Sequence, residues 1–532
     1  MLRILPETGC PVKEAPHKTP PATPEEEKRP RIEWPKTSNK KAWTDFDHEL
    51  DLILEATLQG AVERKLVAMT SLIYTVGKER YGVYVPKHSK PSSQPNRRER
   101  QIQVIRQELK KLRKAYRNAK DEEKLGLQEL RDLQRKQLRE LRKAKTARKN
   151  RRKRAQQRTA FIANPYKFSK KLLDKEKSCI LNSSMEEIQT HLRDTHSDTR
   201  RDDPLGPCAH IMPEPAPTIA LDSKEPTQAE VKDVVKKARA GSAPGPNGIP
   251  YKVYKMCPRL LRRLWRLIKV VWRKGQVPEC WQKAEGLFVP KETNSHNISQ
   301  FRTISLLNVE GKIFFAVLAR RLTTYLTANK YVDTTIQKRA NTKSAGSLSH
   351  TSTCTEDCPG YRDNIQLRFS VREKITEWQR LEKGIITGCT VSVVLFVMGM
   401  NLILNAAKKE TRGPKTAPGI YRPSNRSFMD DLTITTQTHV QARWVLSALE
   451  STTYWARMKF KPKKSRSLII KIGQSIKKFN LQVQGEDIPS IMDSPIKCLG
   501  KWYDARLNET NNVKRIKGQL NEGLKQIDRS WL

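Results

Sequence analysis

Hydrophobic and polar residues follow helical spacing in the first half of this chain, and that spacing predicts where its helices lie. Between residues 43 and 81, large apolar residues recur every three or four positions, which predicts two amphipathic helices. From residue 97 to 158 the apolar residues keep an a/d-like spacing among many cations, so we expect one long helix with a modest coiled-coil seam. Thr227 and Glu230 have the spacing of a capping box, which indicates the start of another helix.

The second half of the chain mixes helical and strand-like segments, which places it in the α/β class. A basic amphipathic helix is expected over residues 260–272, and the chain then turns back into a strand that ends at Lys291. Two apolar segments, 391–404 and 439–455, predict buried helices. Between them, apolar and β-branched residues on both sides of two aspartates predict the arms of a β-hairpin.

The charge of the chain indicates a class of partner. Its 532 residues carry a formal net charge of +46, and the simplest reason for such an excess is binding to the phosphate backbone of a nucleic acid. We find no apolar run long enough to span a bilayer and no signal-peptide layout in residues 1–10, so we expect a reducing compartment and no membrane partner. Residues 1–40 are rich in Pro, Lys and Glu and predict a disordered tail.

The densest run of cations lies near the end of the long predicted helix. Such a density exceeds what the solubility of a helix needs, and it is typical of a nuclear-import signal or of an arm that grips RNA or DNA. We therefore expect a nuclear protein in which this run binds nucleic acid, with an ordinary solvated helix face as the alternative. The residues are Arg148, Lys149, Arg151, Arg152, Lys153 and Arg154.

Cys179, His191 and His196 have the spacing of the second half of a zinc finger. A structural zinc site needs four ligands at a recognised spacing, and no second cysteine stands near Cys179. We therefore favour scattered free thiols over a zinc site.

Two adjacent carboxylates, Asp430 and Asp431, stand at the centre of the hairpin predicted over residues 427–435. Neighbouring aspartates repel each other, so a fold that holds both at a tight turn needs a positive partner there. Mg2+ prefers carboxylate and phosphate oxygens, and two such ions can clamp the attacking and leaving oxygens of a phosphoryl transfer. The pair therefore predicts a magnesium site, with an exposed tip of two solvated acids as the alternative.

Segments around this hairpin resemble, in the same order, motifs of the reverse transcriptases of non-LTR (LINE-type) retrotransposons. The resemblance covers about residues 222–502. It rests on the Pro-Gly loop 243–250, the strand 281–291, the segment 301–307 with Lys312 and residues 320–322, the loop and helix with Gly384, Gly388, Ser392, Leu395 and Phe396, the turn 428–432, the segment 455–467 and the hairpin 497–500.

The resemblance implies a right-hand polymerase fold with fingers and palm, preceded here by a basic helical N-terminal region. It implies an RNA-directed DNA polymerase, a nucleotidyltransferase that acts on an RNA template, a DNA primer or target and deoxynucleoside triphosphates. In that pattern Asp430 and Asp431 are the catalytic ligands of Mg2+. The residues that would contact the nucleotide are Lys291, Arg302, Gly388 and Lys464.

One motif of that family is absent. Its first palm strand carries a third aspartate, and the candidates here, Asp333, Asp357 and Asp363, do not follow an apolar run. Residues 339–360 are rich in Ser, Thr and Gly without a strand pattern, as expected of a deletion or a mis-joined exon. Thr387 also replaces a glutamine that commonly seats the base pair. Two-metal chemistry needs more carboxylate oxygens than one pair supplies, so we expect a catalytically defective enzyme.

These segments predict an order of regions in which both palm and thumb are incomplete. Two alternatives to a defective polymerase stay open: a non-catalytic nucleic-acid-binding relic, and a decayed or erroneous reading frame. The predicted regions are a tail (1–40), a small helical region (41–95), a basic long helix or coiled coil (96–160), a linker (161–220), fingers (221–338), a disrupted segment (339–360), a palm (361–505) and the start of a thumb (506–532).

Overall fold

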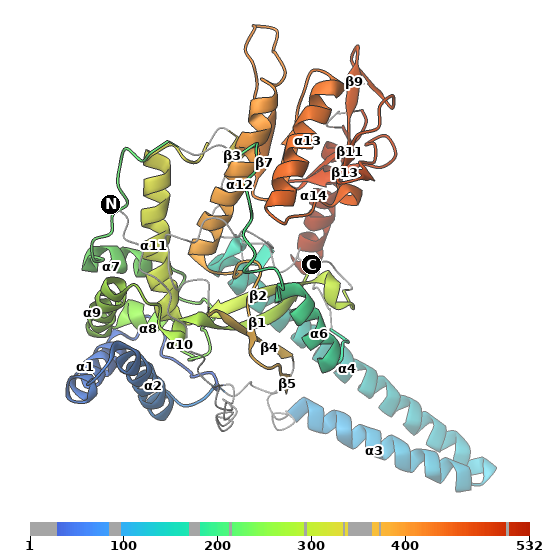
Figure 1. Ribbon diagram of the computed structural model, residues 1–532. Helices are drawn as coiled ribbons and strands as arrows, with labels where there is room; N and C mark the ends of the chain where they lie inside the picture. The colour runs from blue at the N-terminus through green and yellow to red at the C-terminus, as the bar shows by residue number, and fades with distance from the viewer. Residues whose placement is uncertain are drawn as a thin grey trace.

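The computed structural model is a mixed fold of helices and strands with a long helical hairpin that extends from one side (Figure 1). The segment predicted to be disrupted, 339–360, lies outside its described residues. The structure describes residues 29–84, 97–166, 168–169, 181–211, 215–291, 295–333, 336–338, 364–371, 374–506 and 510–531.

Two helices near the N-terminus, α1 (Lys40–Thr57) and α2 (Val62–Tyr81), lie where the apolar spacing predicted them. Both pack on α9 (Pro258–Lys274). The carboxylate of Asp47 in α1 accepts hydrogen bonds from the backbone N–H groups of Arg259 and Leu260, both at 3.0 Å. These donors at the start of α9 would otherwise lack partners, so the contact fixes the N-terminal helices to the body of the protein.

Residues 29–39 pack against the same helices, although the sequence predicted a disordered tail as far as residue 40. Ile32 is 2% exposed and forms a β-bridge with Val83. The ring of Trp34 stacks on Trp43 with 5.9 Å between the ring centroids. The polar composition of residues 1–40 predicted disorder, although Ile32 and Trp34 anchor the segment to the helices. Residues 1–28 lie outside the described part of the chain.

The helical hairpin consists of α3 (Arg97–Asn118) and α4 (Asp121–Ala163), where the sequence predicted one long helix. Gln134 donates to the carboxylate of Glu108 at 2.9 Å, and Lys145 pairs with Glu99 at 2.8 Å, so the helices run antiparallel. The reversal precedes three acids in the first turn of α4, which favour a helix N-terminus there. Ile102 of α3 and Leu138 of α4 are the buried apolar residues of these two helices among those that the structure describes.

A five-stranded sheet lies at the centre of the molecule (Figure 1). β1 (Lys283–Pro290) pairs antiparallel with β2 (Phe301–Leu307) and parallel with β4 (Gln366–Val371), so both edges of β1 are occupied. β5 (Lys374–Ile375) and β6 (Gln379–Arg380) both pair with β4. Helices and turns around this sheet are α6 (Met185–His196), α7 (Gln228–Lys237) with the predicted capping box, α8 (Tyr251–Met256), α10 (Glu279–Gln282), a 3-10 turn (Ile298–Gln300) and α11 (Val309–Ala328).

A smaller sheet carries the two aspartates. Its strands follow the order β3 (Gln337–Lys338), β7 (Asn425–Phe428) and β8 (Asp431–Ile434), with β3 parallel and β8 antiparallel to β7. We call β7, β8 and the turn between them the aspartate hairpin. α12 (Thr390–Glu410) and α13 (His439–Trp455) pack together beside it and share a hydrophobic cluster with Met429 and Phe428.

By length and composition α12 is apolar enough to cross a membrane, which the sequence analysis did not anticipate. However, 67% of its most apolar window is buried inside the protein. α11 and α13 both pack against it. This burial explains the hydrophobicity of α12 as that of a core helix.

Beyond α13 the chain forms three small two-stranded sheets and a final helix. α14 (Thr510–Trp531) packs against α4, so the C-terminal region meets the helical hairpin. The other elements are a 3-10 turn (Pro462–Lys464) and the strand pairs β9 (Ile469–Lys471) with β10 (Gln474–Ile476), β11 (Gln482–Val483) with β12 (Glu486–Asp487), and β13 (Ile496–Cys498) with β14 (Lys501–Tyr503).

Candidate functional site

The aspartate hairpin is closed by a tight turn at Met429 and Asp430. Phe428 and Asp431 face each other as the last pair of the ladder, and Met429 has a φ of 58°. The hydroxyl of Ser427 donates to the carbonyl of Met429 at 2.6 Å, which braces the turn. Met429 is 7% exposed, whereas both aspartates are exposed. The buried methionine thus anchors a turn that presents two carboxylates to solvent.

The electrostatics of this turn are those of an unneutralised pair of acids. Partial burial and the neighbouring carboxylate of Asp430 raise the pKa of Asp431. Burial, and then the charge of Asp431, also raise the pKa of Cys498, so β13 lies near the turn. Among the described residues, no lysine, arginine or histidine forms an ion pair with either aspartate.

We tested whether this site fits a pair of divalent ions. Within the described part of the chain, no group of three or more His, Cys, Asp or Glu residues could hold a metal. Of the three candidates for a third carboxylate, Asp357 and Asp363 lie outside the described residues. Asp333 pairs with Lys408 at 2.7 Å, so its carboxylate is already committed to a cation. Asp430 and Asp431 alone supply too few oxygens for two ions.

Two predicted nucleotide contacts lie at the open end of the β1–β2 pair. Lys291 directly follows β1, and its Nζ donates to the carbonyl of Ser299 at 2.7 Å. Arg302 is exposed on β2, opposite Val289 of β1. The antiparallel pairing therefore brings both cations to the same end of the sheet.

The glycine-rich loop before α12 is fastened to β2. Ser305 N donates to the carbonyl of Thr387 at 3.1 Å, and the Thr387 hydroxyl donates to the carbonyl of Thr303 at 3.0 Å. Gly388 has a φ of 100°, and a Cβ on it would lie 2.8 Å from the Ser305 oxygen. Only glycine suits this position, because the backbone conformation and the close approach both exclude a side chain. Gly388 is thus brought beside the strand that carries Arg302.

Lys464 lies at the end of a 3-10 turn and is exposed. No hydrogen bond or ion pair among the described residues joins it to the aspartates or to Arg302. Its predicted contact with a nucleotide stays a prediction.

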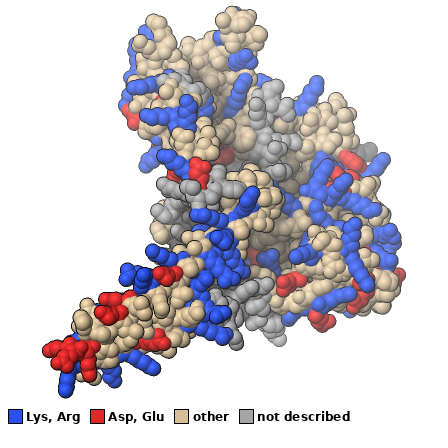
Figure 2. All heavy atoms as spheres, turned by 180° about the vertical axis from the view of Figure 1, so that it is seen from behind, with Lys and Arg blue, Asp and Glu red and all other residues tan. Residues whose placement is uncertain are grey.

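The six cations between 148 and 154 lie on the part of α4 that extends past the start of α3. All six are exposed, and none forms an ion pair within the described part of the chain. Lys145, just before them, is the residue that pairs with α3. Figure 2 shows Lys and Arg gathered where the helical hairpin meets the body, and Asp and Glu at its far tip.

The Pro-Gly loop contributes to the interior of the fold, which the sequence analysis did not predict. Asn247 is 9% exposed and donates to the carboxylate of Glu310 at 2.8 Å. The Tyr254 hydroxyl donates to the other oxygen of Glu310 at 2.5 Å. Burial raises the pKa of Glu310, and these two hydrogen bonds oppose the shift. A single glutamate in the first turn of a helix gave no signal of this buried network.

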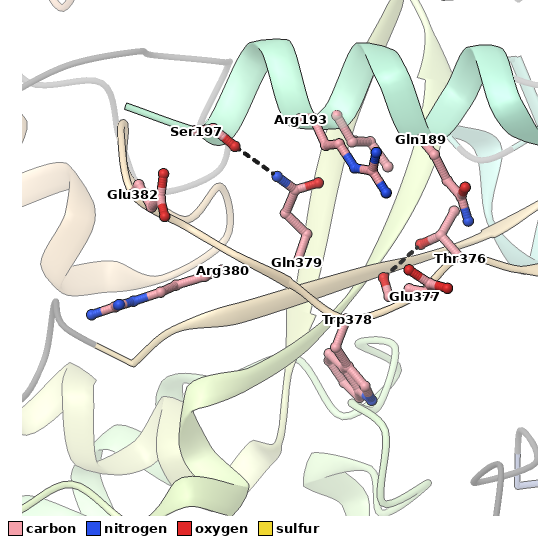
Figure 3. A pocket seen from close by; sticks show the side chains of 10 residues that line it. Gln189, Arg193, Ser197, Thr376, Glu377, Trp378, Gln379, Arg380 and Glu382 are labelled. Atoms are coloured by element: carbon pink, nitrogen blue, oxygen red, sulfur yellow. Dashed lines mark hydrogen bonds between the residues drawn. The ribbon is translucent and has the colours of Figure 1, made fainter. Parts of the chain in front are cut away.

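A cavity of about 280 Å³ between α6 and the segment 376–382 was also not anticipated (Figure 3). Gln379 crosses it and donates to the hydroxyl of Ser197 at 3.1 Å. Arg193 and Arg380 lie on its walls together with Glu377 and Glu382, so its charges are mixed. Such a lining does not select an anion or a cation.

His191 and His196 of α6 do not form a metal site with other described residues, and Cys179 lies outside that part of the chain. Neither ring nitrogen of His196 has a hydrogen-bond partner. Burial, and then the neighbouring His191 and Lys383, lower the pKa of His196 to about 4. The ring is therefore neutral near pH 7 and serves as a packing group.

A comparison with known protein families agrees with part of this assembly. Residues 289–502 match the family model of reverse transcriptase (RNA-dependent DNA polymerase). The matched segment includes Lys291, Arg302, the Gly388 loop, the aspartate hairpin and Lys464, whereas the cations of α4 lie before it. Reverse transcriptases typically use divalent metal ions and bind a nucleic-acid template and nucleotides. Residues 289–502 of this chain are therefore similar to a reverse transcriptase domain.

Proposed function

We propose that this chain is a protein derived from a non-LTR (LINE-type) reverse transcriptase that binds RNA and DNA but is defective in DNA synthesis. In this proposal the five-stranded sheet corresponds to the fingers and the aspartate hairpin to the palm. The observation that carries it is the pair Asp430 and Asp431, which stands without a third carboxylate among the described residues. Mg2+ demands near-octahedral oxygen ligands, and two ions cannot be held by one vicinal pair.

The open edge of the aspartate hairpin supports the same conclusion. β8 pairs with β7 on one side, and no strand in the described part of the chain pairs with its other side. Along β8, residues alternate between exposed and half-buried, as in an edge strand. A strand that supplied the third aspartate would have to lie beside this hairpin. Among the described residues no such strand lies there, so within them the site lacks this ligand and one edge of β8 stays unpaired.

Binding of nucleic acid is supported by a different set of residues. The cations at 148–154 are exposed and lack acidic partners within the described residues, so they can neutralise phosphates at little cost. They lie on a helix that packs against α14, which follows the matched segment 289–502 in the chain. We also propose that this run acts as a nuclear-import signal, which its density of Lys and Arg favours.

Primer extension tests the catalytic half of the proposal. The purified chain is incubated with an RNA template, a DNA primer, nucleotides and Mg2+, beside the double variant Asp430→Asn, Asp431→Asn. We expect no extension above the level of the double variant. Extension that disappears in the double variant would contradict the proposal, because another carboxylate would then complete the metal site.

Salt-dependent binding tests the other half. Replacing the six cations at 148–154 by glutamine should lower the slope of log K against log salt by up to about 5, since each phosphate contact contributes about 0.9. A matched control replaces Arg97, Arg98, Arg100, Lys110, Lys111 and Arg113 of α3 in the same way. Equal losses in both variants would mean that binding follows net charge alone and not this run.

A further inference from the structure

The β9–β10 hairpin has an unusual residue at its tip. Ile472 and Gly473 connect the strands, with φ angles of 49° and 74°. Positive φ at both positions fits a two-residue hairpin turn, where Asn or Asp before Gly is preferred. A β-branched residue rarely adopts this conformation, because its side chain crowds the backbone. Ile472 nevertheless occupies it and is 93% exposed, so the turn presents a large aliphatic side chain to solvent.

Two more exposed aliphatic residues precede the tip in the arm that leads to it. Side chains two positions apart in extended backbone point the same way, so Leu468 and Ile470 share a side, and Ile472 follows them at the turn. They are 37%, 53% and 93% exposed, so exposure increases towards the tip. The first arm of the hairpin therefore has exposed apolar side chains that lead to the most exposed one, Ile472.

The base of this hairpin is fixed to the rest of the C-terminal region. The hydroxyl of Ser475 donates to the carbonyl of Ala505, which follows β14. Lys477 pairs with Asp493 at 2.8 Å, and Ser467 N donates to the carbonyl of Pro489 at 2.9 Å. Both strands are thus held at the base, and the hairpin projects from the C-terminal region (Figure 1).

The charge around the tip favours a polyanion as the partner. Residues 468–478 contain three lysines and no acidic residue. Lys471 stands next to the tip and is exposed, and Lys478 is exposed at the base. A membrane or a protein partner could also cover an apolar face, but a chain of net charge +46 with a domain for nucleic-acid synthesis favours nucleic acid.

A second hairpin turn in the same region also has an exposed aliphatic residue with positive φ at its tip. Leu499 and Gly500 close the β13–β14 hairpin with φ angles of 49° and 85°, and Leu499 is 63% exposed. In contrast, the turn of the β11–β12 hairpin carries Gln484, whose amide is bonded to the carbonyl of Met458 at 3.2 Å. Aliphatic tips are therefore not a general feature of these hairpins.

We propose that Ile472 is a wedge that inserts between base pairs of a nucleic-acid duplex from the minor groove, with Lys471 on an adjacent phosphate. Aliphatic side chains that enter the minor groove in this way unstack a base step and bend the duplex. The turn with positive φ favours this role because it leaves the side chain of Ile472 almost fully exposed at the tip. The inference rests on the proposed function only in that the partner is a nucleic acid.

Fluorescence of 2-aminopurine tests the wedge. The full chain is titrated into a DNA duplex and an RNA–DNA hybrid that carry the analogue at successive steps, and its fluorescence rises where a base unstacks. We expect a rise at one step with the wild-type chain and with Ile472→Met, which keeps an apolar side chain. Ile472→Asn should abolish the rise and weaken binding about fivefold, or about 1 kcal/mol. Asparagine before glycine suits the turn, so the hairpin should persist in this variant.

Three results would overturn the inference. If Ile472→Asn retains the rise in fluorescence, the tip does not unstack bases. If the wild-type chain binds the duplex without any rise, the wedge fails while the proposed binding function stands, whereas absence of binding removes both. If Ile472→Asn converts an oligomer into a monomer in light scattering without a change in fluorescence, the tip is an interface between copies of this chain.

Discussion

The five-stranded sheet and the aspartate hairpin differ in two respects: how many strand edges are paired, and how many polar groups have hydrogen-bond partners. β1 is paired on both edges, and the residues around it belong to a large hydrophobic cluster that extends to α1 and α2. β8 is paired on one edge within the described residues, and its strand is only half-buried. Glu310 is completely buried with both oxygens bonded, whereas Asp430 and Asp431 are exposed and form no ion pair with a described cationic side chain.

This difference separates the part of the protein that maintains the fold from the part that would perform chemistry. Burial of apolar surface and satisfied buried hydrogen bonds dominate stability, and both are concentrated around the five-stranded sheet. The aspartate hairpin buries Asn425, Ser427 and Met429, but both of its aspartates are exposed and β8 is only half-buried. A chain of this kind can lose catalysis and still fold and bind, so the two regions should respond differently to matched substitutions.

The largest expected effect is at Glu310. In Glu310→Ala the buried hydroxyl of Tyr254 and the amide of Asn247 lose their acceptor, and unsatisfied buried donors are costly. We expect the free energy of unfolding to fall by about 3 kcal/mol, measured by urea denaturation. The control is Glu279→Ala, which removes an exposed ion pair with Lys283 and should change stability by less than about 0.5 kcal/mol.

Equal effects of these two substitutions would break the comparison. They would mean that the network of Glu310 does not hold the Pro-Gly loop against α11, and that the interior around the sheet is no better satisfied than its surface.

A smaller effect is expected at His196, and it depends on pH. Burial lowers the pKa of His196 to about 4 in the folded chain, while the unfolded chain keeps a value near 6.5. The stability from the neutral ring is therefore complete above pH 6.5 and is lost as the pH falls towards 4. Because His196 as a whole residue is half-buried, we expect a loss of about 2 kcal/mol, below the full linkage value. His196→Phe should remove this loss.

The measurement compares the unfolding free energies of wild type and His196→Phe at pH 7 and pH 4.5. Other titrating groups change both proteins alike, so the difference between them isolates His196. If the two lose equal stability on acidification, the pKa of His196 in the folded chain is not depressed.

The sequence predicted the elements with strong local signals. Helix α13 coincides with the apolar segment predicted at 439–455, the capping box at Thr227 is present, and the strand that precedes Lys291 is β1. The turn at Asp430 and Asp431 lies between two strands as the flanking residues indicated. Each of these depends on spacing within a few residues, which a sequence displays directly.

Features that depend on contacts between distant segments were missed. The reversal at residues 119–120 has no Pro or Gly, so no local signal indicates that the basic segment turns back and places Lys145 opposite Glu99. The network of Glu310 joins residues more than fifty positions apart. The strained turn at Ile472 could not be predicted either. An isoleucine among apolar residues is typical of a strand, and only the backbone φ distinguishes this position from an ordinary strand residue.

The smallest expected effect is at the aspartate hairpin itself, and its sign opposes that of His196. The raised pKa of Asp431 means that the folded chain disfavours its charge, so stability is lost as the pH rises above the unfolded value of 3.8. Asp430→Asn with Asp431→Asn should therefore stabilise the chain slightly at pH 7, by less than about 0.5 kcal/mol, because the groups are exposed. Thermal unfolding at pH 7 and pH 3.5 measures this gain in stability, which should vanish at the lower pH.

A loss above about 1 kcal/mol at pH 7 would show that the carboxylates hold the turn, which they do only when a cation neutralises them. The aspartates would then form a working ion site, and the separation of fold from chemistry would no longer describe this protein.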